Sequence, residues 1–307
     1  MEVGLLSPSN SGRALKLSVM LQKTLPVLAC LALVAGSCGV KNQNPEGLTP
    51  VSVHVNDFRI TIDNISDTKA TDAASYSNLK ALTLAFYEDS HEVFKSTQLQ
   101  GDAHFGDFSL NLPLGTYTMV VLGYSCYEGD VLTLTSPTSA AFTAGRIGET
   151  FAYTQEVTVS NTDELELSAT LDRIVAKFNV VSDDHRTQGA EKVRMTFSGG
   201  SKAFNPTTGL ATSDAGFSNT VNISTNVGAR SASISYLFLN TPEQTMDVTV
   251  EVLNSTDEVL YHKEMRNIPF KLNRTTKLTG KLYTATAPGS TAFQVNEDWL
   301  DDLVVPF

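Results

Sequence analysis

The chain has 307 residues, of which 41% are hydrophobic and 18% are charged, and these values are ordinary for a globular protein of about two domains. Its formal net charge is −11, so it would repel a phosphate backbone, which argues against nucleic acid as a partner. Thr, Ser, Val and Leu recur throughout, and this composition favours strands over helices.

The first informative segment is an export signal in residues 20–39. Lys23 supplies a basic start, and an apolar run of about a dozen residues follows, too short to span a bilayer comfortably. Small residues then lead into Cys38. These are the parts of a signal peptide, so we predict that residues 1–37 are removed on export. Met20 fits best as the true start, because the basic region is best placed when it is counted from there.

The small residues before Cys38 resemble the lipobox of bacterial lipoproteins, in which the Cys thiol receives a diacylglyceryl group with palmitate-type chains. That resemblance implies a lipid on Cys38, a polar tether over residues 38–50, and anchoring to the cell outer membrane. The alternative is a plain secretory signal with a coincidental Cys. Residues 1–37 carry Arg13, Lys16 and Lys23 against Glu2, so their removal changes the net charge from −11 to −13.

Three cysteines occur in the sequence, and only Cys126 remains after Cys30 leaves with the signal peptide and Cys38 is lipidated. The mature protein is therefore predicted to lack an intramolecular disulfide. No Cys–His–Asn signature surrounds Cys126, so we expect a half-buried thiol at the end of a strand.

Period-two alternation of apolar residues begins at Val51 and continues through Val53 and Val55. It resumes at Phe58 after Asn56 and Asp57, which predicts a half-buried strand with a bulge or turn at these two residues. The polar stretch 63–78 is predicted to be an exposed loop.

Further strands follow, each marked by alternating apolar residues: Leu82, Leu84 and Phe86; Phe108, Leu110 and Leu112; Tyr117, Met119 and Val121; Val157 and Val159; Leu165, Leu167, Ala169 and Leu171. Pro113 and Gly115 predict a tight turn between the second and third of these strands, because Pro fixes φ and Gly permits positive φ.

The pattern restarts near residue 172 and recurs to the end of the chain: Ile174, Ala176, Phe178 and Val180; Val193, Met195 and Phe197; Ile234, Tyr236 and Phe238; Val248, Val250 and Val252; Val259 and Tyr261. Many short strands separated by turn residues are typical of β-sandwiches. We predict an all-β protein with two sandwich domains, 51–171 and 172–307. Arg173, Val175 and Lys177 should share one face, where the basic residues have a structural role.

Motifs for catalysis or metal binding are absent from the sequence. The five histidines include no pair at i,i+4 spacing, and no HExxH, CxxC or GxSxG occurs. The trio Asp183, Asp184 and His185 has metal-ligating groups, but a solvated turn is the simpler interpretation. The acidic residues at 296–302 lack the ligand spacing of a calcium loop. We therefore expect no enzyme activity, no cofactor and no metal.

Glycan binding remains open as an alternative, because exposed aromatic side chains can stack on sugars. The aromatic residues available for such a platform are few: Tyr76, Tyr124, Tyr127 and the single Trp, Trp299.

Three segments, at 112–125, 171–180 and 267–284, resemble the fimbrillins of Bacteroidota, which are subunits and anchors of surface fimbriae. The first reads LPLGTYTMVVLGYS, the second LDRIVAKFNV and the third NIPFKLNRTTKLTGKLYT. The resemblance implies two tandem transthyretin-like β-sandwich domains in a stalk, anchor or tip subunit that supports adhesion. Its alternative is a surface lipoprotein that does not polymerise and binds glycans.

The same resemblance implies assembly by strand addition, in which an Arg-specific protease removes a first strand and a strand of the next subunit replaces it. Candidate cleavage sites are Arg59, inside the predicted strand, and Lys69, in the predicted loop. The candidate donor is the C-terminal stretch, through Phe293, Val295, Leu303 and Val305. The other possibility is that 51–62 is a permanent strand of an anchor subunit. The implied partners are other fimbrial subunits, the outer membrane and a host or bacterial surface receptor.

Overall fold

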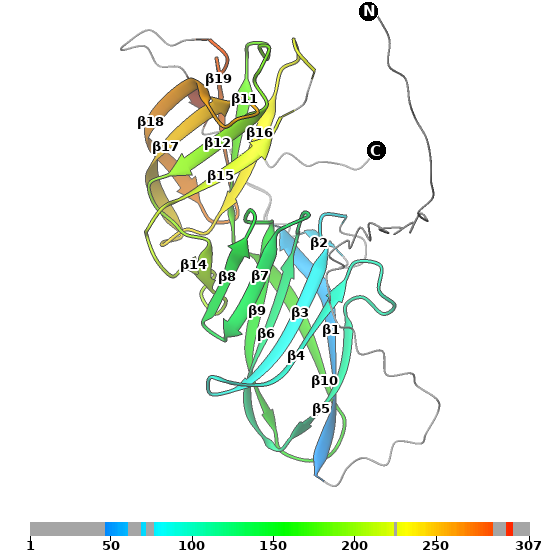
Figure 1. The fold of residues 1–307 in the computed structure, drawn as a ribbon. Coiled ribbons are helices and arrows are strands. Elements are labelled where there is room, and N and C mark those ends of the chain that lie inside the picture. Colours follow the sequence, from blue (N-terminus) through cyan, green and yellow to red (C-terminus); the bar gives the residue numbers. More distant parts are fainter. Residues whose placement is uncertain (1–46, 61–68, 72–76, 224–225, 285–292, 297–307) are drawn as a thin grey trace, which may run out of the picture. The chain divides into compact units, whose positions relative to one another are not determined.

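The computed structural model describes residues 47–60, 69–71, 77–223, 226–284 and 293–296 (Figure 1). Within these ranges all regular elements are strands, β1 to β20, and no helix occurs. The predicted all-β class is therefore confirmed. The signal peptide, Cys38, Tyr76, Trp299, Leu303 and Val305 lie outside the described residues.

The first sandwich is built from eight strands that form one continuous hydrogen-bonded path, β2-β1-β10-β9-β6-β3-β4, with β5 attached to β1. One layer holds β1 (Leu48–Ile60), β2 (Lys69–Thr71), β5 (Asp107–Pro113) and β10 (Leu165–Arg173). The other holds β3 (Ala81–Glu88), β4 (His91–Leu99), β6 (Gly115–Tyr124) and β9 (Thr150–Val159). The layers are joined where the end of β10 pairs with the start of β9, at Asp172↔Ala152 and Arg173↔Phe151.

The core of this sandwich lies between the two layers and collects the alternating apolar residues of both. One layer contributes valines of β1 and aromatic and aliphatic residues of β5 and β10, and the other contributes residues of β3, β6 and β9. The main members are Val51, Val53, Phe108, Leu110, Leu171, Leu84, Phe86, Met119, Val121 and Val157. Each strand thus turns every second side chain inward, as the sequence pattern predicts.

A third layer covers the outer face of the β9-β6-β3-β4 layer. It is a four-stranded sheet of β7 (Val131–Ser136), β8 (Ser139–Ala144), β13 (Ala203–Asn205) and β14 (Leu210–Ala211). Its residues pack with a second set from β3 and β6, including Ala85, Tyr87 and Leu122. Strand β3 is therefore buried over seven consecutive residues. A strand covered on both faces carries a nearly continuous apolar run.

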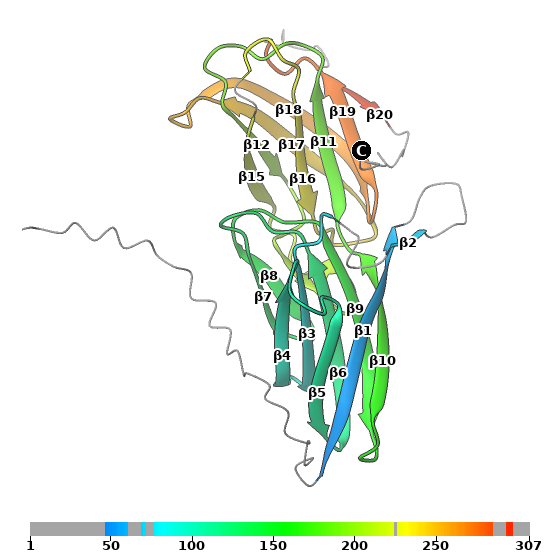
Figure 2. The ribbon, with the colours of Figure 1, turned by 90° about the vertical axis from the view of Figure 1, so that its right-hand side faces the viewer.

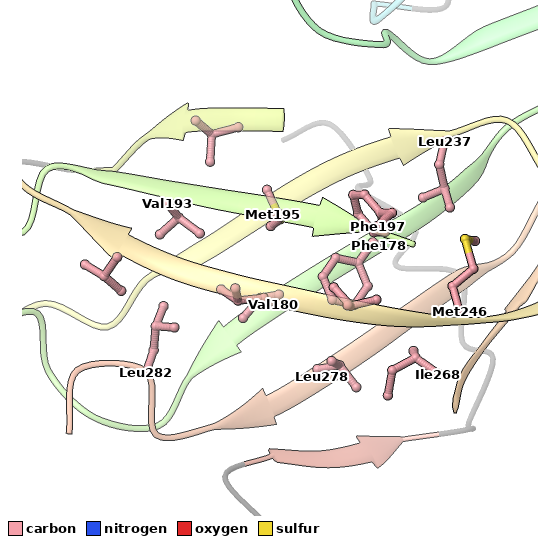
Figure 3. Packing of buried hydrophobic residues seen from close by; sticks show 14 of the residues in the cluster. Phe178, Val180, Val193, Met195, Phe197, Leu237, Met246, Ile268, Leu278 and Leu282 are labelled. Carbon is pink, nitrogen blue, oxygen red and sulfur yellow. The ribbon is translucent and has the colours of Figure 1, made fainter. Parts of the chain in front are cut away.

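The second sandwich has two four-stranded sheets. The order β16-β11-β19-β20 joins β16 (Ala232–Leu237), β11 (Ala176–Ser182), β19 (Thr275–Gly280) and β20 (Phe293–Asn296). The order β15-β12-β17-β18 joins β15 (Phe217–Asn222), β12 (Lys192–Phe197), β17 (Glu243–Leu253) and β18 (Val259–Lys271). Between them Phe178, Phe197 and Phe270 pack edge-on or tilted, with ring centroids 5.5–6.0 Å apart. Figure 3 shows Phe178 and Phe197 side by side in this core.

The turn between β5 and β6 differs from its prediction in one respect. Gly115 has no positive φ. Its missing Cβ instead leaves room for Tyr117, whose hydroxyl would lie 2.9 Å from a Cβ at that position. The same hydroxyl donates to the carbonyl oxygen of Pro113 at 2.9 Å. Burial, and secondarily the charge of Glu88, raises the pKa of Tyr117, so the proton needed for this bond is retained.

The chain passes from the first to the second sandwich through Ile174 and Val175, between β10 and β11. Both side chains are buried in the cluster beneath the third layer. The prediction that Val175 shares an outer face with Arg173 and Lys177 is therefore wrong. A connection packed against three layers does not keep the strict alternation of a two-layer strand.

Candidate functional site

Strand β1 lies inside its layer, with a neighbour on each edge (Figure 2). It pairs in parallel with β10 from Val51↔Leu165 to Arg59↔Asp172. On the other edge, residues 48–54 pair antiparallel with β5, and residues 58–60 pair antiparallel with β2. Both edges of β1 are thus paired, by the nearby strand β2 and by β5 and β10, which are distant in the sequence.

The inward side chains of β1 are three valines with almost no exposed surface. Val51 is 1% exposed, Val53 0% and Val55 5%. Burial of a valine contributes about 1.5–3 kcal/mol, so these three residues hold the strand firmly. Thr49 adds a hydrogen bond from its hydroxyl to the carbonyl oxygen of Asn161, at 2.5 Å.

The outer face of β1 carries an exposed ion pair with β5. His54 Nδ1 lies 2.9 Å from Asp107 Oδ1, and both side chains are about half exposed. Exposed pairs of this kind contribute little to stability. The strand is therefore retained by its valines and its backbone ladders.

The register of β1 against β10 shifts between Val55 and Asp57. This confirms the predicted irregularity at Asn56–Asp57. The backbone keeps partners on both sides of the irregularity. Before it, Val55 N donates to Gly106 O at 2.8 Å, and after it Phe58 pairs with both Leu171 and Thr71.

The two candidate cleavage residues lie in neighbouring strands, one register position apart. Arg59 is in β1, where its backbone is opposite Asp172 on one edge and Ala70 on the other. Lys69 is the first residue of β2 and is opposite Ile60. The prediction of an exposed loop over 63–78 is therefore wrong at 69–71 in that these residues form a strand, which pairs with β1.

The candidate donor segment is described at Phe293–Asn296, which forms β20. It pairs antiparallel with β19, from Gly280↔Phe293 to Lys277↔Asn296. Among the described strands it is the last in its sheet, and β19 is its one partner there. Strand β20 is therefore attached by a short ladder of four residues on one edge.

Arg173 lies at the end of β10 and is partnered, as predicted. Its Nη2 is 2.6 Å from Glu149 Oε1, its Nη1 donates to Asn273 Oδ1 at 3.2 Å, and its guanidinium carbon lies 5.4 Å from the centroid of the Phe151 ring. Glu149 belongs to the first sandwich's loop before β9, and Asn273 follows β18. Arg173 therefore links the two sandwiches.

The candidate metal trio in the β11–β12 loop does not converge. Asp183 and His185 are exposed, and Asp184 accepts hydrogen bonds from Leu282 to Thr284. Across the described ranges no group of three His, Cys, Asp or Glu residues is arranged to hold a metal ion. Sequence periodicity gave no signal for the role of Asp184, because its partners lie 98–100 residues further along the chain.

Cys126 and the described aromatic candidates have simple environments. Cys126 is a free thiol of intermediate burial just after β6, as predicted, and burial raises its pKa, with Asp130 adding to this and Lys80 opposing it. Tyr124 is buried in the cluster under the third layer. Tyr127 is 58% exposed, with the Arg146 guanidinium carbon 4.3 Å from its ring centroid. These tyrosines do not form a shared platform.

Among the residues with described positions, no helix has the length and apolarity needed to cross a membrane.

A protein-family model matches residues 53–304, and it describes a family of unknown function, DUF6562. No curated protein matches the sequence. Among solved structures, a candidate adhesin from Bacteroides ovatus is similar over 83% of this chain and 96% of its own, with 13% identity and a TM-score of 0.50.

Two fimbrial proteins from Porphyromonas gingivalis are also similar. The fimbrial anchor protein Mfa2 matches 80% of this chain and 95% of its own, with 15% identity and a TM-score of 0.44. The tip fimbrial protein Mfa3, with a C-terminal truncation, matches 81% and 98%, with 11% identity and a TM-score of 0.37. The similarity to the Bacteroides ovatus structure is a likeness of fold, and the three similar proteins are described as an adhesin and two fimbrial proteins.

Proposed function

This chain belongs to DUF6562, a family of unknown function, and we propose that it is a structural subunit of cell-surface fimbriae that supports adhesion. It is exported as a lipoprotein, anchored through Cys38, and assembled with other subunits by strand addition. The observation that carries this proposal is the position of β1, a strand near the start of the mature chain that is paired on both edges and fills the first core.

Removal of β1 would leave a groove between β5 and β10. Strand β1 pairs with β5 over seven residues, from Leu48 to His54. The groove would therefore be roughly 23 Å long at the rise of a β-strand. The groove would expose unpaired backbone groups on both sides and the apolar surface that Val51, Val53 and Val55 now cover. A donated strand with alternating apolar residues would pair these backbone groups and cover this apolar surface again. Assembly by strand addition is therefore strongly favoured once the groove is open.

The C-terminal segment has the properties of such a strand. Phe293 and Val295 alternate with polar residues, and Leu303 and Val305 continue an apolar pattern later in the sequence. The described part, β20, is a four-residue edge strand with one neighbour. Detaching it breaks one short ladder, which is a small cost beside the two ladders and the core available in a vacant groove.

Cleavage at Arg59 or Lys69 would release all or part of β1 in a stalk subunit. An anchor subunit would keep β1 and present only its other surfaces to the neighbouring subunit. Both roles place the protein at the cell surface, with other subunits as partners and the outer membrane as the site of the lipid. The surface receptor follows from neither role.

Deletion of residues 292–307 tests the donor role. We expect the truncated protein to stay folded, as measured by circular dichroism, and to stop forming filaments, as measured by electron microscopy of sheared surface material. A matched pair refines the test. Val295→Asp should block polymerisation, because alternation in a donated strand would put Val295 and Phe293 on the same inward face. Gln294→Asp, at the intervening position, should not block it. Filaments from the truncated protein would show that the tail is not the donor.

A further inference from the structure

Residues 282–284, which follow β19 after Lys281, are held from one side by a single carboxylate. The backbone N–H of Leu282 donates to Asp184 Oδ1 at 2.8 Å, and that of Tyr283 donates to Asp184 Oδ2 at 2.9 Å. The Thr284 hydroxyl donates to the same Oδ2 at 2.8 Å. Asp184 lies in the loop after β11, so it ties this segment to the strand that neighbours β19. Hydrogen bonds to an ionised carboxylate are roughly twice as strong as neutral ones.

The opposite sheet holds the same segment through Lys263 of β18. Its Nζ donates to the carbonyl oxygen of Thr284 at 2.6 Å. Lys263 is 4% exposed, which is rare for a lysine. Burial lowers the pKa of its ammonium group, and the nearby charge of Asp184 opposes that shift. The long cationic side chain of Lys263 is thus buried where it contacts the backbone of Thr284.

The side chains of the segment add to its attachment. Leu282 is 0% exposed and Tyr283 is 3% exposed, and both belong to the core of the second sandwich. The Tyr283 hydroxyl lies 2.5 Å from Ser231 Oγ, and its ring packs edge-on against Tyr261 with centroids 6.4 Å apart. Three separate elements therefore converge on these three residues: the β11–β12 loop, β18 and the connection that precedes β16.

We infer that this clasp, formed by Asp184 and Lys263 around residues 282–284, is the fixed boundary between the permanent second sandwich and its exchangeable tail. The inference rests on the proposed donor role of the tail. Beyond the clasp, β20 is attached through four residues on one edge of β19. Because the clasp holds the chain before that point, detachment of β20 stops at Thr284 and does not reach β19 or the core. A subunit can then donate its tail without unfolding.

Hydrogen exchange of the full mature chain tests the clasp without requiring polymerisation. In Asp184→Asn, we expect the amides of Leu282 and Tyr283 to exchange at least about tenfold faster, since a hydrogen bond to a charged group contributes more than a factor of ten to a local equilibrium. The exchange of Leu278 in β19 should change much less. Asp183→Asn is the matched control, because it removes the same charge from the adjacent exposed position and should leave both amides unchanged.

Two truncations locate the boundary. A chain ending at Thr284 should keep its melting temperature within about 3 °C of the full chain, whereas a chain ending at Lys281 should lose more than about 5 °C, because it also loses two buried side chains. Equal losses in the two truncations, unchanged exchange in Asp184→Asn, or equally faster exchange at Leu278 would each overturn the clasp. Failure of the donor role would appear instead as filaments formed by the chain lacking residues 292–307.

Discussion

Arg173 brings a positive charge into a nearly closed environment at the junction of the two sandwiches. Its side chain is 15% exposed, and that of its partner Glu149 is 5% exposed. Removing one member of a buried pair leaves the other charge without compensation, and this costs about 3–5 kcal/mol. We expect Arg173→Ala to lower the free energy of unfolding by that amount, measured by chemical denaturation.

The control for this prediction is an exposed pair on the second sandwich. Lys271 Nζ lies 2.6 Å from Glu243 Oε1, with side chains 46% and 68% exposed. Lys271→Ala should change the stability by no more than about 0.5 kcal/mol. A variant Arg173→Ala that keeps its stability but loses binding to a surface would contradict the structural role.

At the residue scale, sequence patterns predicted which side chains face inward but missed interactions between distant segments. Val51, Val53 and Val55 are buried as their alternation predicts. Asp184 was interpreted as part of a solvated turn, because its three partners are about a hundred residues away in the sequence. The expected reason for glycine at 115, a positive φ, was also wrong. Tyr117 instead occupies the space that a Cβ at this position would fill.

Strand β1 protects its own candidate cleavage site. Arg59 has paired backbone on both edges, whereas Arg230 is exposed in the connection between β15 and β16. Proteases need an extended and accessible segment, and paired strands supply one only after local opening. We expect an arginine-specific protease to cut the folded chain after Arg230 at least about tenfold faster than after Arg59, as followed by mass spectrometry of the fragments.

The same experiment bears on when β1 is removed. If Arg59 is protected in the folded chain, cleavage there must precede completion of the sheet or follow an opening of β1 and β2. Arg230→Lys removes this competing site, and cutting at Arg59 can then be timed through its own fragment. Faster cutting at Arg59 than at Arg230 in the unmodified chain would show that β1 opens readily.

At the element scale, the sequence predicted the two-layer sandwich but not its third layer. The alternation Leu82, Leu84 and Phe86 marks the face of β3 that meets the first core. The other face carries Ala81, Ala85 and Tyr87, which are also buried. That continuous run was the available signal for a strand covered on both sides. The covering strands β13 and β14 come from beyond residue 200, so no local pattern could identify them.

At the scale of the whole described molecule, the third layer joins the two sandwiches. Strand β13 pairs with β8 through Phe204↔Ala140. The Phe204 ring stacks on Phe238 with centroids 4.1 Å apart and an interplanar angle of 18°, and both side chains are fully buried. Phe238 in turn lies next to Phe142 of β8, at 6.3 Å. Because the shared cluster belongs to both sandwiches, we expect them to unfold together.

Phe204→Ala tests this coupling. Truncation of a buried phenylalanine to alanine lowers the free energy of unfolding by about 3–5 kcal/mol. Here the lost contacts are those of the shared cluster. We expect scanning calorimetry to show one transition for the unmodified chain and two for Phe204→Ala. Phe178→Ala is the control, since Phe178 packs only in the core of the second sandwich, and it should lower the single transition without splitting it. One transition in Phe204→Ala would mean that other contacts couple the sandwiches.

The shared layer also sets an order of events as the exported chain emerges with its N-terminal part first. Strand β8 ends at Ala144, but β13 and β14 are not complete until Ala211. There is therefore a period in which β8 has emerged but β13 and β14 have not. During that time the outer faces of β3 and β6 are only partly covered, and their apolar side chains can attract other unfinished chains. A chaperone that shields apolar surface is therefore needed most when about half of the polypeptide has emerged.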